Sequence, residues 1–344
     1  MWRIISPARP GVFDGIGDFS GLLADALQPF HPTALVVRRA RWDELESVAI
    51  DETAAVIVQY VPQAYMHGDL RALLRWVGRV RATGAPVVLV VHEYWPPQDG
   101  TLRRTAVRWL FRRMLRACMR RSDALVTSQE FSAGELSSFA RRTVHAIPVG
   151  SSVPCVTPRA PEPGRHLVLF GQPAALHAPT MRALGAWLGT TPDVSLTWLG
   201  RSSEEMQAAW HGQWGLSAAR VRFAGGLPAA DVSAVLNRST LALAPYENGA
   251  STRRTTFAAF MQHALPTVAV DGLYTSDWLR AADACVWTPE GEPAAFVAGV
   301  ATLLGDAAEQ SRLSARAAAL HAERLSWPVI GAAYARLLME GVSR

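Results

Sequence analysis

Lysine is absent from the 344-residue sequence, so every fixed cationic side chain is an arginine. A Schiff-base mechanism needs a side-chain amine, and a P-loop nucleotide site needs its lysine. Both kinds of chemistry are therefore excluded. Cysteine is scarce as well: Cys118, Cys155 and Cys285 have no CxxC spacing, which argues against a disulfide framework or a cysteine-ligated zinc site.

Long apolar runs and a strong charge imbalance are also missing. The longest apolar stretches, such as Ala85–Val91, have the length of a strand, far below the ~20 residues that span a bilayer. Met1–Ser6 has the pattern of a strand and not of a signal peptide. The net charge of +5 is small for this length and indicates no nucleic-acid partner. We therefore expect a cytoplasmic protein in a reducing compartment.

Short apolar runs alternate with amphipathic segments in both halves of the chain, which predicts α/β architecture with parallel sheets covered by helices on both faces. The expected strands are Trp2–Ser6, Ala34–Val37, Ala54–Gln59, Pro86–Val91, Ala124–Thr127, Val144–Ile147, His166–Phe170, Val194–Leu199, Val221–Ala224, Leu241–Ala244, Thr267–Val270 and Ala284–Trp287.

A proline-rich segment, 151–164, separates the halves and is the expected linker. We predict two Rossmann-like, doubly wound domains, 1–150 and 165–325, that face each other across a cleft. Ligands of such sheets bind beyond the C-terminal ends of the strands.

Glycines follow the first strand, in the loop Pro10–Ser20, before a helix expected from about Asp18. Gly15 and Gly17 fit the start of a dinucleotide fingerprint, but Ser20 takes the third glycine position and no acid ends the second strand. The loop is either a tight turn or a place where backbone N–H groups approach a phosphate.

Three polar or aromatic residues, His92, Glu93 and Tyr94, come directly off a buried strand. They either satisfy local hydrogen bonds or touch substrate hydroxyls in the cleft.

A basic helix is expected over Leu102–Ser122, which holds eight arginines and no acid. Val107, Leu110, Phe111, Met114, Leu115 and Cys118 form its apolar stripe. Trp109 lies among the arginines and not in the stripe. The basic face is either solvated or makes a peripheral contact with an anionic membrane at its inner face.

The most informative loop lies between the strand Leu241–Ala244 and a helix expected over Arg253–Ala264. Ser251 or Thr252 is expected to cap this helix. Arg253 and Arg254 would then occupy the first helical turn, where cations oppose the helix dipole. Two arginines beside free N–H groups indicate a bound di-anion such as a pyrophosphate.

Several segments, in order, resemble the family-4 retaining glycosyltransferases. They are the Gly15–Gly17 loop, Val88–Glu93, Ser122–Ser128, Ser132–Leu136, Ala146–Gly150, Leu167–Gly171, Leu196–Gly200, Val221–Gly225, Pro266–Ala269 and Leu325–Tyr334. The last segment resembles a C-terminal pattern in which the final helix, here 326–344, crosses back to the first domain.

The resemblance implies the GT-B fold, a nucleotide-diphosphate-sugar donor held mainly by the second domain, and an acceptor at the first. It implies transfer with retention of configuration and without a metal or other cofactor. His92 and Glu247 would be catalytic, at the donor sugar. The implied donor-binding residues are Gly15, Gly17, Gly171, Gln172, His177, Arg201, Asn248, Gly249, Ala250, Ser251, Thr252, Arg253 and Arg254. Asp18, Glu93 and Tyr94 would face the acceptor.

This sequence departs from the family pattern at the diphosphate and at the ribose. Gln172 stands where the family places an arginine, and His177 is the nearest replacement for its lysine. The second of two paired glutamates is missing, since its position holds Thr255 or Ala259. We expect Arg253 or Arg254 to replace the missing cations.

The sequence thus predicts a bacterial glycosyltransferase of polysaccharide, glycolipid or natural-product biosynthesis. Its acceptor would be a carbohydrate, a lipid-linked sugar or a small molecule. The alternatives are an inactive GT-B protein that binds a sugar nucleotide or a protein partner, a nucleotide-sugar epimerase and an oxidoreductase.

Overall fold

The structure, a computed structural model, describes residues 1–7, 15–37, 45, 48–66, 69–96, 101–216 and 220–342. Its contacts divide the chain into two compact units. The first unit is Met1–Pro148 together with the segment from Trp327 onward, and the second is Val149–Ser326. The proline-rich segment 151–164 belongs to the second unit, where Ala160 N–H donates to Asn237 O (3.1 Å).

The first unit contains a six-stranded sheet in which every pairing is parallel, in the order β2-β1-β3-β4-β5-β6. Its strands are β1 (Trp2–Ser6), β2 (Thr33–Val37), β3 (Ala55–Tyr60), β4 (Val87–Val91), β5 (Ala124–Thr127) and β6 (His145–Ala146). All six predicted strands are present. β3 and β4 are buried at every position, as expected for strands with helices on both faces.

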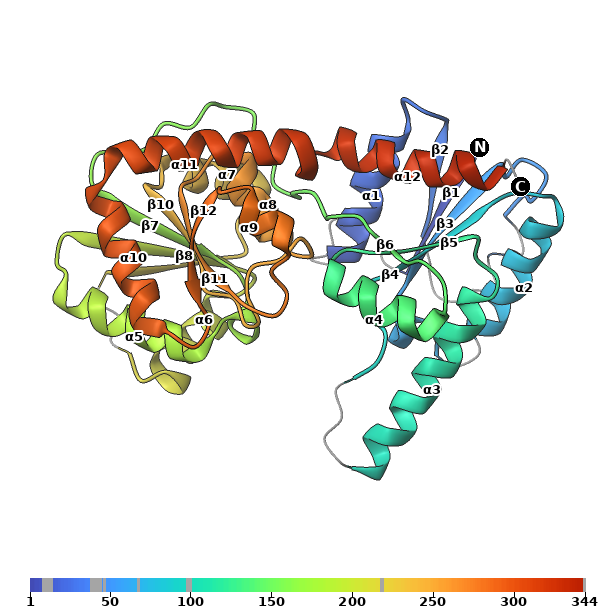
Figure 1. The fold of residues 1–344 in the computed structure, drawn as a ribbon, viewed down its shortest axis with the longest axis horizontal. Coiled ribbons are helices and arrows are strands. Elements are labelled where there is room, and N and C mark those ends of the chain that lie inside the picture. The colour runs from blue at the N-terminus through green and yellow to red at the C-terminus, as the bar shows by residue number, and fades with distance from the viewer. Residues whose placement is uncertain are drawn as a thin grey trace. The chain divides into compact units, whose positions relative to one another are not determined.

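The helices of the first unit are α1 (Gly15–Leu27), the 3-10 turn η2 (Pro62–Tyr65), α2 (Asp69–Ala82), α3 (Leu102–Met119), α4 (Glu130–Ala140) and α12 (Trp327–Val342). The last helix packs closely on the first. A β-carbon on Gly331 of α12 would lie only 2.5 Å from Ala26 O of α1, so only glycine allows this approach. The chain thus begins and ends in one unit (Figure 1).

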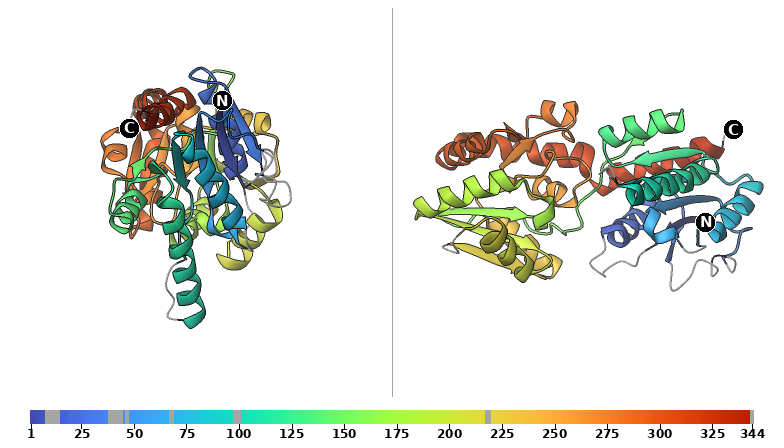
Figure 2. Two further views of the ribbon diagram at one scale, coloured as in Figure 1. Left: turned by 90° about the vertical axis from the view of Figure 1, so that its right-hand side faces the viewer. Right: turned by 90° about the horizontal axis from the view of Figure 1, so that it is seen from below.

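The basic helix α3 projects from its unit at its N-terminal end (Figures 1 and 2). It ends at Met119, earlier than the predicted Ser122, and buries Phe111, Met114, Leu115, Cys118 and Met119. Trp109 is 62% exposed among the arginines, as predicted. The placement of Leu110 in the apolar stripe is wrong, since Leu110 is 38% exposed on the projecting part, which has no neighbouring core to cover it.

The second unit contains another all-parallel sheet of six strands, in the order β12-β11-β10-β7-β8-β9. Its strands are β7 (Arg165–Phe170), β8 (Val194–Gly200), β9 (Val221–Gly225), β10 (Leu241–Ala244), β11 (Thr267–Asp271) and β12 (Cys285–Pro289). Each lies within two residues of its predicted bounds. The two doubly wound sheets are the fold that the sequence predicts.

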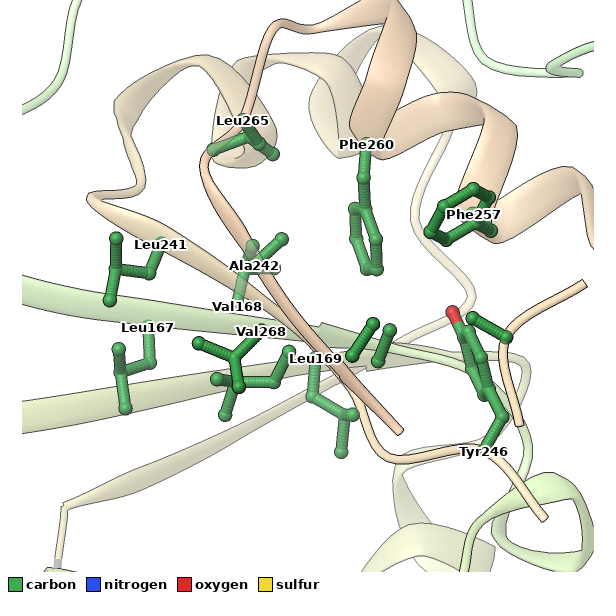
Figure 3. Close-up of a cluster of buried hydrophobic side chains, with 14 of the residues drawn as sticks. Leu167, Val168, Leu169, Leu241, Ala242, Tyr246, Phe257, Phe260, Leu265 and Val268 are labelled. Atoms are coloured by element: carbon green, nitrogen blue, oxygen red, sulfur yellow. The ribbon is translucent and has the colours of Figure 1, made fainter. Parts of the chain in front are cut away.

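Helices on both faces cover this second sheet. They are η3 (Pro173–Ala175), α5 (Ala178–Thr190), α6 (Ser203–Gln207), the π-helical η4 (Ala208–Gln213), α7 (Ala229–Arg238), α8 (Thr255–Gln262), α9 (Asp277–Ala281), α10 (Pro293–Gly305), α11 (Ala307–Leu320) and η5 (His321–Leu325). In the core, Phe257 and Phe260 of α8 lie over β7 and β10, with Tyr246 beside them (Figure 3). Within the described ranges, no helix is long and apolar enough to cross a membrane.

Candidate active site

The strand order of the second unit makes the C-terminal ends of β7 and β10 the expected place for a ligand. These neighbouring strands are the switch point, because the chain continues from β7 to β8 on one side and from β10 to β11 on the other. Ligands of open α/β sheets bind outside the C-terminal ends of strands at such a point. The loops 171–177 and 245–254 begin there.

Backbone hydrogen bonds join these two loops. His177 N–H donates to Pro245 O (2.8 Å), and Glu247 N–H donates to Ala175 O (3.0 Å). An isolated antiparallel bridge pairs Leu176 with Tyr246 between them. The loops therefore hold His177 and Glu247 side by side, as a site made from both would require.

A third polar residue, Glu290, completes this group. It follows β12, and its Oε1 accepts a 2.5 Å hydrogen bond from Asn248 N–H. His177, Glu247 and Glu290 each place one potential metal-ligand atom within 4.8 Å of the others. Glu290 is not among the residues predicted from the sequence, although it directly follows β12, a position that could have indicated it.

The imidazole of His177 is held by the helix that it precedes. His177 is the N-cap of α5, and its Nδ1 forms a 2.8 Å hydrogen bond with the buried Thr180 hydroxyl. Because Nδ1 is engaged by the protein, Nε2 is the ring nitrogen left for contact with a ligand.

The helix after β10 begins later than predicted. Its first residue is Thr255, and Arg254 occupies the N-cap with extended backbone angles. The placement of Arg253 and Arg254 in the first helical turn, with Ser251 or Thr252 as the cap, is therefore wrong. No N-cap side chain accepts a hydrogen bond from α5 or α8, so the helices that follow β7 and β10 both begin without a side-chain cap.

The guanidinium of Arg254 lies over the ring of Tyr246, 4.4 Å from its centroid. One Nη donates to Glu247 O (3.4 Å), whereas the buried Nε has no hydrogen-bond partner among the described residues. Burial lowers the pKa of Arg254, but an arginine keeps its charge. Arg253 is exposed.

The Tyr246 phenol fixes the platform under Arg254. Its hydroxyl donates to Phe170 O (3.0 Å) and is 2.8 Å from the Thr256 hydroxyl, so it links β7 to the start of α8. Burial raises the pKa of Tyr246 to about 12. The phenol therefore stays neutral and acts as a structural link.

The predicted donor residues between Glu247 and Arg253 form a tight turn and the buried stretch that follows it. Asn248 and Gly249 have positive φ angles, +60° and +90°, and form a tight turn. Ala250, Ser251 and Thr252 are buried, with Ala250 N–H bonded to Val270 O (2.9 Å). This turn sets the direction of the chain between Glu247 and Arg254.

Three further predicted donor residues lie at neighbouring strand ends. Gly171 is buried against Tyr246, and Gln172 is half-buried at the start of η3. Arg201 is exposed and directly follows β8, the strand next to β7. All three belong to the same end of the second sheet as His177.

In the first unit, His92 follows β4 and points toward α1. Its Nε2–H donates to Gln59 Oε1 (2.6 Å), and its ring meets that of Phe19 edge-on, with centroids 5.4 Å apart. α1 begins at Gly15, earlier than the predicted Asp18, so Gly15, Gly17 and Asp18 all lie in its first turn. Residues 10–14 of the predicted glycine loop lie outside the described residues.

The other two predicted acceptor-side residues differ in their surroundings. Glu93 is exposed. The Tyr94 hydroxyl donates to Glu135 Oε2 of α4 (2.6 Å), and its ring meets that of Trp95 edge-on. Tyr94 is therefore anchored to the helix that follows β5.

Residues 177–306, within the second unit, match the model of the family described as Glycosyl transferases group 1. No curated protein sequence is significantly similar to the chain.

Solved structures share the fold over the whole chain. A sucrose-phosphate synthase from Thermosynechococcus elongatus has a TM-score of 0.69 at 12% identity, covering 99% of both chains. WaaG, a glycosyltransferase involved in lipopolysaccharide biosynthesis, has a TM-score of 0.63 at 13% identity, and the match covers 98% of this chain and 99% of WaaG. HepE from Anabaena, solved in complex with UDP, has a TM-score of 0.69 at 14% identity, and the match covers 99% of this chain and 100% of HepE. The chain therefore has the two-domain GT-B fold of these glycosyltransferases.

Proposed function

We propose that the protein is a glycosyltransferase that moves a sugar from a nucleotide diphosphate to a carbohydrate or lipid-linked acceptor, with retention of configuration. The observation that carries this proposal is the group of residues beyond the C-terminal ends of β7 and β10. There a half-buried arginine, a histidine, two glutamates and two helix N-termini converge, inside the segment that matches the glycosyltransferase family model.

In this proposal the diphosphate of the donor lies at the N-termini of α5 and α8. Transfer breaks the bond between the sugar and the diphosphate, so the leaving group gains negative charge that nearby cations and N–H groups stabilise. Arg254 supplies the fixed charge, and its guanidinium is held over the ring of Tyr246. His177 Nε2 and the exposed Arg253 are the further candidates, and Glu247 accepts hydrogen bonds from sugar hydroxyls.

The acceptor and the reacting end of the sugar are assigned to the first unit. His92 is the proposed catalytic contact with the donor sugar, and Gly17 lies at the N-terminus of α1, where an anion is stabilised. We propose Gln59 as a positioning residue, because its amide oxygen accepts a hydrogen bond from the His92 ring (2.6 Å).

A metal ion is not needed in this proposal, because arginine and helix termini supply the positive charge. His177, Glu247 and Glu290 nevertheless have the residue types and spacing that a divalent cation accepts. EDTA should therefore leave transfer unchanged. A loss of transfer that Mn²⁺ or Mg²⁺ restores would contradict metal independence.

We also propose that α3 makes a peripheral contact with anionic lipid. It presents Leu102 and Trp109 beside arginines on the part of the helix that projects from its unit. Such a face would bring the enzyme to a lipid-linked acceptor.

The experiment is a thermal-shift and calorimetric titration with UDP-, GDP-, ADP- and dTDP-sugars, which identifies the donor base. Arg254→Ala should weaken binding of the best donor about 10- to 100-fold, since a hydrogen bond to a charged group contributes about 1.5–3 kcal/mol. Arg253→Ala tests the second arginine, and the double variant should abolish binding.

Arg165→Ala is the matched control. Arg165 opens β7 at the opposite end of the same sheet and pairs with Asp193 (2.8 Å), so its loss should leave donor affinity unchanged. Unchanged affinity in the Arg253/Arg254 double variant would refute the assignment of the diphosphate to these arginines.

One observation favours a second candidate function, sugar-nucleotide binding without transfer. Of the two positions for the missing glutamate, Ala259 is fully buried in the core and Thr255 offers only a hydroxyl. Donor binding without transfer or hydrolysis, across a panel of acceptors, would favour this candidate.

A further inference from the structure

A second cluster of arginines lies in the first unit, around a cavity that no residue of the proposed donor site lines. A cavity of about 530 Å³ opens where α3 and α4 end. Four of its lining residues are arginines, Arg116, Arg120, Arg141 and Arg142, and none of the lining residues is acidic. Its volume is within the range of small-molecule sites.

The favourable interaction of cations with helix C-termini explains some of these arginines but not all of them. Arg116 lies in the last turn of α3 and Arg120 is its C-cap, where cations interact favourably with the helix dipole. Arg141 is the C-cap of α4, with φ of +55°. Glycine or asparagine is the usual residue in that left-handed conformation, so an arginine there is unfavourable for the backbone.

Among the described residues the four guanidinium groups lack a paired acid, although Asp123 and Glu340 line a neighbouring pocket together with Arg120 and Arg142. Within the described ranges none of them forms an ion pair with a carboxylate. The nearby Asp123 is already engaged by Arg81 (2.8 Å) and by Val87 N–H (2.8 Å). Burial lowers the pKa of Arg142, with only partial compensation from Asp123. Four like charges around one cavity repel each other unless an anion joins them.

An aromatic ring holds one of the arginines in position. The guanidinium groups of Arg112 and Arg116 each lie 4.6 Å from the centroid of the Phe139 ring, which also lines the cavity. A cation–π contact fixes the orientation of Arg116 and uses the face of the guanidinium, while its N–H edges stay available. The cluster is therefore partly ordered before a ligand arrives.

We propose that this cavity binds a ligand with a phosphomonoester or diphosphate group, held by Arg116, Arg120, Arg141 and Arg142. Arginine matches phosphate oxygens in bidentate geometry, and several arginines select for more than one negative charge. The ligand is either a soluble phosphorylated metabolite or a phosphorylated lipid head group, which share this chemistry. This site does not depend on the glycosyltransferase proposal.

The test measures binding of inorganic pyrophosphate by calorimetry at constant ionic strength. The starting protein is the Arg253→Ala/Arg254→Ala variant, because pyrophosphate could also occupy the proposed donor site. Adding Arg116→Gln and Arg142→Gln should weaken pyrophosphate binding at least 10-fold. The matched control adds Arg113→Gln and Arg121→Gln, which remove two exposed arginines of the same segment that do not line the cavity.

A further variant separates binding from structure. Arg141→Gly should keep or raise the melting temperature, because glycine adopts the left-handed conformation without strain, and should still weaken pyrophosphate binding several-fold. Arginines kept only to cap α4 would show the opposite result, a lower melting temperature with unchanged binding.

Vesicles distinguish the two sources of the ligand. Binding to phosphatidic acid vesicles that exceeds binding to phosphatidylglycerol vesicles, and that the cavity variant loses, supports a lipid head group. Pyrophosphate binding without that preference supports a soluble ligand. Equal losses in the cavity and control pairs, or no pyrophosphate binding, would overturn the proposal, since the arginines would then act only as diffuse surface charge.

Discussion

At the scale of single residues, Gly249 shows how the backbone of the proposed donor loop is fixed. Its φ of +90° is one that other residues rarely adopt, and an added β-carbon would lie 2.4 Å from Gly272 N and 2.5 Å from Thr275 Oγ1. Gly249→Ala should therefore destabilise the second unit by about 2 kcal/mol or more and weaken donor binding. Urea unfolding and donor titration measure both effects.

The control for that prediction is Gly305→Ala. Gly305 has no atom within 4 Å of an added β-carbon and is exposed at the end of α10. This substitution should change the free energy of unfolding by less than about 1 kcal/mol, in either direction. A Gly249→Ala variant as stable as the Gly305→Ala variant would contradict the tight turn.

A buried histidine makes the stability of the second unit depend on pH. His263 Nδ1–H donates to Ala259 O (2.8 Å), so Nε2 of the neutral ring accepts from the Ser233 hydroxyl (2.8 Å). Burial lowers the pKa of His263 below its ordinary value of 6.5. The unfolded chain binds a proton near that pH while the folded ring does not. The contribution of His263 to the free energy of unfolding should therefore be fully present above about pH 6.5 and decrease as the pH falls below that value.

The measurement is chemical unfolding between about pH 8 and pH 5. His263→Gln should reduce the slope below pH 6.5, and His321, whose pKa burial also lowers, accounts for part of the remaining slope. His145→Gln removes an exposed imidazole from the other unit and controls for the loss of a histidine. An unchanged slope in His263→Gln would mean that His263 does not control this transition.

The sequence pattern indicated the candidate residues at strand ends but not those that depend on contacts between distant segments. His177 and Glu247 follow strands, and a strand end is visible in the sequence. Glu290 joins them only because Asn248, 42 residues earlier, turns its N–H toward it. The role of Tyr246 as the platform for Arg254 also depends on tertiary packing, which periodicity does not encode.

At the scale of elements, the strands were predictable because buried parallel strands are short, continuous apolar runs. The first residues of the helices were less predictable than the strands. α1 begins at Gly15 and α8 at Thr255, each a few residues from its predicted start, because the local sequence offers several residues that could end the preceding loop. The error at α8 matters most, since it moves Arg254 from the helical turn to the N-cap.

The exposed Trp109 of α3 leads to a prediction about membrane binding. Trp109 is 62% exposed, and the guanidinium of Arg113 lies 5.6 Å from its ring centroid. Inserting a large apolar side chain into a membrane interface gains about 1.5–3 kcal/mol. Trp109→Ala should therefore lower partitioning onto anionic vesicles about tenfold or more, without a change in melting temperature.

Flotation with anionic and neutral vesicles at low and high salt measures this partitioning. Leu273→Ala, which removes another exposed apolar side chain from the second unit, is the control. Salt should weaken binding, because the arginine face contributes through charge. No binding of the unmodified protein to anionic vesicles at low salt would end the membrane hypothesis.

At the scale of the whole molecule, the two units differ in continuity. The second unit is a single stretch, Val149–Ser326, and the described residues of its hydrophobic core all lie between Val153 and Leu325. The first unit needs both ends of the chain, because α12 returns to pack on α1. The C-terminal pattern Leu325–Tyr334 suggested this return in the sequence, whereas the close contact at Gly331 follows from the packing.

This difference predicts how fragments behave. Residues 149–326 alone should fold in one cooperative transition and bind the donor nucleotide, because their core and both helix N-termini are complete. Residues 1–148 alone should not fold, since they lose the buried Ile330, Tyr334 and Leu338 of α12. At about 1.5–3 kcal/mol each, these side chains contribute about 5–9 kcal/mol, comparable to the entire stability of a domain. Circular dichroism and calorimetry of both fragments provide the measurement. A stable 1–148 fragment would show that α12 is dispensable, and an unfolded 149–326 fragment would show that the second unit depends on the first.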